Sequence, residues 1–394
     1  LPYLRLFTDM LSEWDTEKGS VTDFRNRVKM HLGAFYVTPH PTKKGDDVKL
    51  YISLKLACLD KEKDNALGLI SEHLYLTLFN DKDLLAKNVK QLYTYSVESI
   101  VSRGDAFAVM RDAAKPSPFE ALSESLFGHS YHLFIKKLSE EIDNRADDVL
   151  LRFEAIRDKY FRRERLTVAL TDPCGVDFAE RIISVIKDGG EAPGACRIKT
   201  LPKINEGIAA PVTVSFAART GNLHEIGKNL YTGAFSLLSN IISFEILWDE
   251  IRLKRGAYDT GFTAKPNSGT IGCYSYRDPS PETSVSFFKN IKDEIHTFLA
   301  DSPNLLKYII GVIGSSDTVS TPRTDGSNAT KHYLAGKTHK DIVKARNECL
   351  EATHDELKRI SELIGEVMEK STFTIVASRD TLEGIKGIDA ILDI

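Results

Sequence analysis

The sequence predicts an α+β protein of two domains, each an antiparallel sheet with helices packed on one face. Two observations predict this class: strand patterns occur as hairpins in both halves, and long segments of helical periodicity surround them. A parallel doubly wound sheet is disfavoured, because single strands do not alternate with single helices. The 394 residues exceed one ordinary core. We place the domains at 1–190 and 206–394, with the interdomain linker in the Gly- and Pro-rich segment 189–194.

The first domain is predicted to open with two helices and a hairpin. Apolar residues at helical spacing indicate a helix over 4–11, and a polar break precedes a second helix over 21–31. Strict alternation indicates a strand over 48–56, antiparallel to 34–38. The rest is predicted to be helical over 65–160 and to end in a short strand. The expected helix breaks and that strand are 80–81, 103–104, 115–118 and 166–170.

The second domain repeats this order in outline. A strand precedes a long buried helix and a hairpin that turns at 265–269, and three helical segments lead to a last strand. The predicted elements are strand 211–218, helix 230–252, hairpin 257–276, helices 281–300, 305–311 and 339–369, and strand 372–377.

Composition argues against several classes of partner. The 56 acidic and 52 basic residues give a net charge of −4 and are spread along the chain, so no basic block would follow a nucleic acid. The most apolar segment, 230–248, contains polar residues, so we expect a buried helix and no membrane partner.

Two further features bear on the compartment and on the source of the chain. Five dispersed cysteines favour a reducing intracellular compartment, either bacterial cytoplasm or an organelle matrix. The chain begins with Leu1 and enters a helical segment at once, which predicts a piece of a longer protein without its targeting signal.

Motifs for common active sites are absent from the sequence. Neither His-Glu-x-x-His nor His-x-x-Glu-His occurs, and the nearest string, 69–73, has Leu69 where a ligand is required. His129 and His132 could share a helix face but lack a matching carboxylate, so no metal site is predicted. Residues 336–338 end like a phosphate loop, but Lys331 occupies the place of its first glycine. Serine-hydrolase and dinucleotide motifs are likewise absent.

Ordered blocks in the second domain resemble a known family. They are Pro211 to Phe216, Gly221 to Leu223, Ile251 to Tyr258, Ser275 to Pro279, Tyr308 to Gly314, Asp317, Tyr333 to Gly336 and the helix near Arg346. This order resembles the C-terminal domain of presequence proteases and falcilysin, in the pitrilysin and insulinase family of zinc metallopeptidases. The first domain resembles the family's repeated domain with its zinc motif erased. Residues 6–10 stand where an active repeat has His-x-x-Glu-His, and only Asp9 corresponds to the Glu.

The resemblance implies four homologous domains in two bowl-like halves around a closed chamber. It implies that this chain is the zinc-free C-terminal half, inactive alone, of an endopeptidase that degrades unstructured peptides. The N-terminal catalytic half would be its partner and would hold the zinc. The family's substrate-binding Arg and Tyr map onto Arg252 and Tyr258, for which we expect peptide positioning and oxyanion stabilisation.

Simpler interpretations of these residues stay open. Arg252 could cap the carbonyl end of the long helix, and Tyr258 could pack in the following strand. Arg255 and Asp259 replace two glycines of the family pattern and could add a charge pair. The segment 275–279 favours a strand end with Arg277 and Asp278 paired over a chamber loop.

An alternative function is a free-standing non-catalytic subunit, or a scaffold, of a two-chain pitrilysin-like protease. Retention of Arg252 and Tyr258 argues against a pure scaffold. In either case, apolar surface normally covered by a catalytic half would be exposed, so self-association of this chain is expected.

Overall fold

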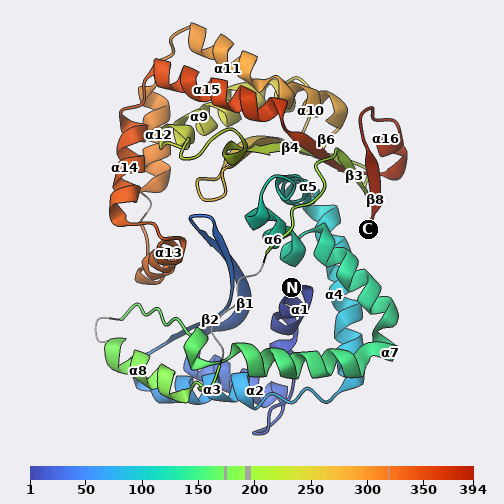
Figure 1. The fold of residues 1–394 in the computed structure, drawn as a ribbon, viewed down its shortest axis with the longest axis vertical. Coiled ribbons are helices and arrows are strands. Elements are labelled where there is room, and N and C mark those ends of the chain that lie inside the picture. Colours follow the sequence, from blue (N-terminus) through green and yellow to red (C-terminus); the bar gives the residue numbers. More distant parts are fainter. Residues whose placement is uncertain (173–174, 191–196, 318) are drawn as a thin grey trace.

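The computed structural model describes residues 1–172, 175–190, 197–317 and 319–394. Figure 1 shows the first half of the chain below the second half, with the chain running from the lower layer into the sheet at the top. The α+β class predicted from the sequence is confirmed, since helices pack against both β-structures.

The chain opens with the predicted helix pair. Helix α1 spans Pro2–Met10 and buries Leu6, Phe7 and Met10. Helix α2 spans Val21–His31, and Ser20 caps it through reciprocal hydrogen bonds with Asp23. A Ser followed three residues later by an acidic residue is the local signal for such a start, which explains why the boundary could be predicted.

A long hairpin follows, longer than the alternation alone indicated. Strand β1 (Leu32–Lys44) pairs antiparallel with β2 (Asp47–Cys58), and Val37 lies opposite Leu54. Gly45 turns the chain with a φ of +59°. The described part of the first domain therefore holds this two-stranded hairpin instead of a broader sheet. The hairpin rises from the lower layer towards the second half of the chain, where the Asp46 carboxylate lies 3.2 Å from Lys228 Nζ (Figure 1).

Six helices complete the described first half, and the predicted helix breaks are confirmed. They are α3 (Lys63–Tyr75), α4 (Lys82–Ser102), α5 (Gly104–Ala113), α6 (Pro118–Phe127), α7 (His129–Tyr160) and α8 (Gly175–Val185). The predicted strand 166–170 is wrong: these residues pair with no other strand among those described, and Leu166 and Leu170 are exposed. Of the predicted linker, residues 191–194 lie outside the described residues, while Gly189 and Gly190 donate to Glu164.

The second half contains a six-stranded sheet in the order β5-β6-β4-β7-β3-β8. The hairpin β5–β6 and the strand β7 were predicted, and β4 begins four residues later than expected. Two pairings differ from the expected antiparallel sheet, since β3 runs parallel to both β7 and β8. The bounds are β3 Glu206–Ala209, β4 Ser215–Asn222, β5 Asp259–Ala264, β6 Thr270–Asp278, β7 Thr372–Ala377 and β8 Ala390–Asp393.

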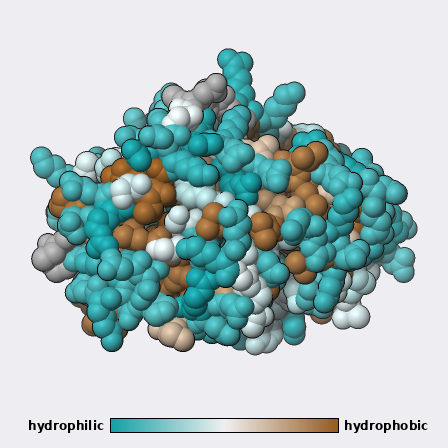
Figure 2. All heavy atoms as spheres, turned by 90° about the horizontal axis from the view of Figure 1, so that it is seen from below, coloured by the Kyte–Doolittle hydropathy of each residue, from teal (hydrophilic) through white to brown (hydrophobic). Residues whose placement is uncertain are grey.

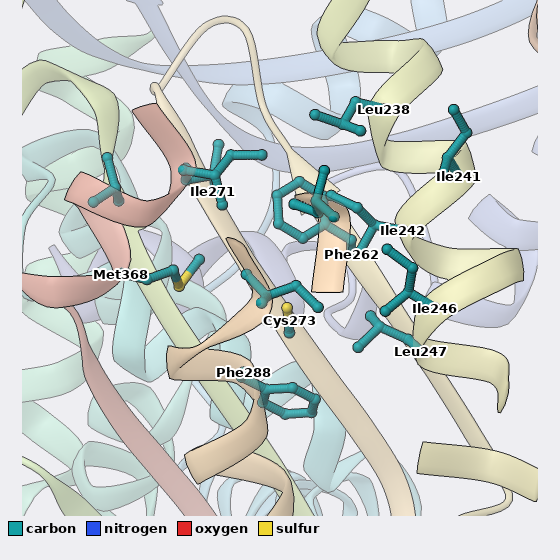
Figure 3. Packing of buried hydrophobic residues seen from close by; sticks show 14 of the residues in the cluster. Leu238, Ile241, Ile242, Ile246, Leu247, Phe262, Ile271, Cys273, Phe288 and Met368 are labelled. Carbon is teal, nitrogen blue, oxygen red and sulfur yellow. The ribbon is translucent and has the colours of Figure 1, made fainter. Parts of the chain in front are cut away.

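The main core lies on one face of this sheet. Helix α9 (Ala234–Ile241) continues into the π-helix η5 (Ile242–Leu253), and together they form the predicted buried helix. Figure 3 shows Ile242, Ile246 and Leu247 from this segment facing Phe262 of β5 and Cys273 of β6. Helices α10, α11 and α15 close the core over Pro281–Lys289, Ile291–Ala300 and His354–Glu369.

Helix α5 covers the opposite face of the sheet, so helices do not lie on one face alone. Ala108 packs in a cluster with Phe216 and Ala218 of β4 and with Val376 of β7. A charge network accompanies this contact: Arg111 Nη2 lies 2.9 Å from Glu206 on β3, and Lys115 Nζ lies 2.7 Å from Asp112. The two halves therefore share a buried interface.

The remaining helices lie at the outer end of the second half. Helices α12 (Leu306–Ser316) and α14 (His339–Leu350) pack against α9. Helix α13 (Pro322–Ala335) was not predicted, because it buries no residue and so has no apolar stripe to detect. Two short C-terminal elements, α16 (Arg379–Glu383) and β8, also lacked a periodic signal.

Surface hydropathy is mixed. Hydrophilic residues cover most of the face in Figure 2, and hydrophobic residues gather in several patches among them. Exposed apolar side chains on α2, α7 and α8 include Met30, Leu151 and Val176. Within the described ranges, none of the helices combines the length and apolar character that crossing a bilayer requires.

Candidate functional site

Arg252 lies in the last turn of the π-helix η5. Ile246, Leu247 and Ile251 bury one side of this helix against the sheet and so fix its rotation. Trp248 and Arg252 lie on another side, where the guanidinium carbon of Arg252 is 3.9 Å from the Trp248 ring centroid. A guanidinium over an indole face is an attractive arrangement, which holds the arginine without neutralising its charge.

Tyr258 follows the sharp turn between η5 and β5. Gly256 makes this turn with a φ of +82°, a region that favours glycine. The Tyr258 backbone N–H donates to the Tyr276 carbonyl oxygen at 3.0 Å, while its side chain is 64% exposed. The strand pairing therefore fixes the backbone and leaves the phenol facing solvent.

The structure brings the two residues predicted from the sequence together. The Arg252 guanidinium carbon lies 5.8 Å from the Tyr258 ring centroid. No hydrogen bond joins the Arg252 side chain to a helix carbonyl among the described residues, and exposure of the Tyr258 ring is contrary to a packing role. Neither simple interpretation of the pair is therefore favoured by the geometry.

Three neighbours of this pair were missed as site residues. Trp248 lies four residues before Arg252, a spacing that places both side chains on one helix face and could have been noticed. The Tyr276 ring meets the Tyr258 ring edge to face at 6.0 Å. The Arg277 guanidinium carbon is 5.9 Å from the Tyr258 centroid. We name these five residues, Trp248, Arg252, Tyr258, Tyr276 and Arg277, the aromatic–arginine cluster.

The expected pairing of Arg277 with Asp278 is wrong. Strand β6 ends at Asp278 as expected, but its buried carboxylate accepts a hydrogen bond from Ser275 Oγ at 2.6 Å and from the Ser280 N–H at 2.8 Å. These bonds satisfy Asp278 locally, so Arg277 turns to the aromatic rings.

The two residues that replace family glycines do not pair with each other in the described structure. Arg255 lies over the Phe287 ring, 5.3 Å from its centroid, and its nearest ion-pair partner is Glu250 at 3.8 Å. Asp259 begins strand β5 opposite Tyr276. The turn keeps its one left-handed position at Gly256, so Arg255 needs no glycine-like conformation.

The segment in place of the zinc motif does not fit a metal. Leu6, Phe7 and Met10 are buried in the core of the first half. Asp9 accepts hydrogen bonds from Arg5 at 2.8 Å and from the Tyr131 hydroxyl at 3.0 Å, while burial raises the pKa of its carboxyl. Apolar side chains around one occupied carboxylate offer no ligand set for zinc.

His129 and His132 serve packing and hydrogen bonding instead of metal binding. His129 Nε2 lies 3.0 Å from the Asp393 carbonyl oxygen, and His132 Nδ1 lies 2.8 Å from Ser96 Oγ. Burial lowers the pKa of His132 to about 4. Within the part of the chain that is described, no cluster of three His, Cys, Asp or Glu side chains is arranged to bind a metal ion.

The phosphate-loop-like string is a junction between two helices. Gly336 ends α13 in a left-handed conformation with a φ of +69°, and Thr338 caps α14 through Asp341. Glycine at a helix end and threonine at a helix start each have a structural reason, so the string carries no phosphate chemistry.

Comparison with known protein families divides the chain into two matched regions. Residues 205–379 match the family model of the PreP C-terminal domain. Residues 1–138 match the model of a region associated with subfamily C of the M16 peptidases. The aromatic–arginine cluster lies within the first of these matches.

Similar proteins cover the chain almost completely. Presequence protease 1, chloroplastic/mitochondrial, from Arabidopsis thaliana is 25% identical over 97% of this chain and 36% of its own length. Protein HypA from Clostridium perfringens is 24% identical over 98% of this chain and 40% of its own length. The chain therefore spans about two fifths of the curated relatives it matches.

A solved structure supports the fold. The crystal structure of a peptidase M16 inactive domain from Pseudomonas fluorescens superimposes with a TM-score of 0.62 at 14% identity. It covers 95% of this chain and 87% of that chain. At such low identity the likeness supports the arrangement of elements and says nothing of individual side chains.

Proposed function

The chain belongs to the presequence-protease branch of the M16 peptidases, and from this membership we propose that it is the substrate-binding, metal-free half of a peptide hydrolase. A second, catalytic half would complete the enzyme, in keeping with the share of its relatives that the chain spans.

One observation carries the proposal: an exposed phenol lies beside a guanidinium that is fixed on an indole. Tyr258 is held by its backbone and Arg252 by Trp248, so both polar groups are positioned before a ligand arrives. Preorganised donors lose little entropy when they bind, which is what a substrate-binding site requires.

The two side chains suit different parts of a peptide. When water adds to the scissile carbonyl carbon, negative charge develops on the carbonyl oxygen, and the Tyr258 hydroxyl would donate a hydrogen bond to it. Arg252 presents parallel N–H groups that would hold a neighbouring peptide carbonyl or carboxylate. Tyr258 would thus lower the barrier to hydrolysis, and Arg252 would set the register of the peptide.

The metal would belong to the other half. The segment around Asp9 is filled by buried apolar side chains and does not fit zinc, so we assign the metal, its ligands and the general base to the catalytic half. The chain alone is then expected to be inactive.

The proposed substrates are unstructured peptides. The relatives named presequence proteases are consistent with peptide substrates of this kind. A closed chamber formed by two halves would exclude folded proteins and admit flexible chains, and we propose that the aromatic–arginine cluster faces that chamber.

A second candidate function has its own supporting observation. The similar solved M16 chain is named an inactive domain and has nearly the same extent as this one. A free-standing non-catalytic subunit, pairing with a separate zinc-bearing chain, would also use the Arg252 and Tyr258 pair.

The test is a fluorogenic peptide cleavage assay with zinc content measured by elemental analysis. It is made on this chain alone and on this chain combined with the catalytic half. Cleavage and stoichiometric zinc only in the combined sample support the proposal. Zinc or cleavage by this chain alone would place the active site elsewhere, and no cleavage by either sample would remove the peptidase function.

A further inference from the structure

Arg277 has a backbone conformation that arginine seldom adopts. Its φ is +49°, and only two other non-glycine residues in the described ranges, Asn229 and Ser302, also have a positive φ. Side chains with a Cβ disfavour this region for steric reasons, so the neighbouring structure must hold it.

Contacts on both sides of Arg277 hold this conformation. The Tyr276 carbonyl accepts from the Tyr258 N–H, and the Tyr276 hydroxyl donates to the Ser102 carbonyl at 3.3 Å. On the other side, the Asp278 carboxylate is anchored by Ser275 and Ser280. A glycine would satisfy the backbone without strain, so an arginine here calls for another reason.

The unusual backbone directs Arg277 to the predicted site. Its guanidinium carbon is 5.5 Å from the Tyr276 centroid and 5.9 Å from that of Tyr258. Arg252 approaches the same Tyr258 ring at 5.8 Å. Two guanidinium groups therefore flank one exposed phenol.

These two arginines lack the acidic partners of their neighbours. Lys254 pairs with Asp249 at 2.8 Å, and Arg255 has Glu250 at 3.8 Å. Among the described residues, no carboxylate forms an ion pair with Arg252 or Arg277; both contact aromatic rings instead. Because arginine stays protonated, two uncompensated charges remain beside Tyr258.

We propose that Arg252 and Arg277 together bind a carboxylate of the peptide substrate and so select peptides with an acidic group beside the cleaved bond. The inference rests on the proposed function and adds a specificity to it. Paired guanidinium groups match carboxylates through bidentate hydrogen bonds, while the aromatic rings keep both groups oriented when no ligand is bound. The acidic group could be a Glu side chain or the C-terminal carboxylate.

The experiment measures binding, so it does not depend on turnover. Fluorescently labelled peptides that differ only by Glu against Gln, and only by a C-terminal acid against an amide, are titrated into this chain by anisotropy. The wild-type chain should bind one acidic form about tenfold more tightly than its neutral counterpart, the scale of one charge-assisted hydrogen-bond pair. The preferred pair identifies which carboxylate is bound.

Two variants of Arg277 separate specificity from structure. Arg277→Gln should reduce the acidic preference to about twofold or less, because only Arg252 remains. Arg277→Gly should lose the preference equally while keeping or raising the melting temperature, because glycine relieves the positive φ. A purely structural Arg277 would lower the melting temperature when it is replaced.

A matched control removes the same charge at a distant place. Arg152→Gln on α7 should keep the full preference, which excludes a general electrostatic effect. Equal binding of acidic and neutral peptides by the wild-type chain, or a full preference retained by both Arg277 variants, overturns the proposal. The cleavage assay is independent of these results, so failure of the peptidase function would be recognised separately.

Discussion

The Lys115 ammonium lies 2.7 Å from the Asp112 carboxylate, and neither side chain is exposed to solvent. The pair joins the two halves of the chain. Lys115 also donates to Thr374 of β7 at 3.0 Å, and Asp112 accepts from the Thr220 N–H of β4 at 2.6 Å. Helix α5 is therefore attached to two strands of the sheet by a buried ion pair whose hydrogen bonds are shared with both strands.

Removal of one member of this pair should be costly. Lys115→Met keeps most of the volume but leaves the Asp112 carboxylate buried without its cation, which typically costs about 3–5 kcal/mol. Urea unfolding followed by circular dichroism measures the loss.

An exposed pair supplies the control. Lys82 Nζ lies 2.8 Å from Asp147, but both side chains are largely exposed. Lys82→Met should change the free energy of unfolding by no more than about 0.5 kcal/mol, because solvent screens such pairs. Similar losses in both variants would show that burial of the Lys115 pair does not determine its contribution.

The hydroxyl of Tyr258 is expected to act in catalysis and not in folding. In the complete enzyme, Tyr258→Phe should lower kcat about a hundredfold, the scale of losing one oxyanion donor. The melting temperature should stay unchanged, because the side chain is largely exposed. Tyr333→Phe on α13 removes another exposed hydroxyl and should leave kcat unaltered. An unchanged kcat in Tyr258→Phe would remove this residue from the mechanism.

Local signals made much of the fold predictable. Ser20 and Asp23 mark the start of α2, and Gly269, with a φ of +73°, turns the chain into β6. By contrast, the parallel pairing of β3 with β7 joins residues far apart in the sequence, so no local pattern could indicate it. The covering of the sheet by α5 depends on equally distant contacts, such as Lys115 with Thr374.

The candidate site was predictable only in part. Resemblance supplied Arg252 and Tyr258, and helical spacing could have supplied Trp248. Arg277 could not be placed, because its side chain reaches Tyr258 through a conformation that opposes the usual preference of arginine. Its adjacency to Asp278 suggested an ion pair, while hydrogen bonds from Ser275 and Ser280 already satisfy that carboxylate.

Stability should fall in mild acid because of a buried histidine. His73 stacks on Phe24 at 5.2 Å, and burial lowers the pKa of its imidazole from 6.5 to about 4. Between these values the unfolded chain binds a proton that the folded chain does not, so stability decreases as the pH falls from about 6.5 to 4.

The contribution of His73 can be isolated by substitution. At pH 5 this single group should have cost about 2 kcal/mol relative to pH 7.5. His73→Phe replaces the imidazole with a ring that cannot titrate, so urea unfolding at the two pH values should show a loss smaller by that amount. The same loss in both proteins would mean that His73 is protonated in the folded state at pH 5.

Two glycines in different surroundings should respond to alanine with opposite signs. Gly233 caps α9, and its N–H donates to Glu348 on α14 at 2.7 Å. A Cβ at this position would lie 1.7 Å from the Ala345 carbonyl oxygen, so α14 would have to move away. Gly233→Ala should therefore destabilise the protein by about 1–3 kcal/mol, as overpacking does.

Gly68 lies inside α3, and a Cβ there would meet no atom within 4 Å. Gly68→Ala should stabilise the protein by about 0.5–1 kcal/mol, because alanine has less conformational entropy to lose. Thermal unfolding of both variants beside the wild type gives the two signs directly. A raised melting temperature in Gly233→Ala would contradict the close contact of α9 with α14, and with it the placement of the outer helices over the main core.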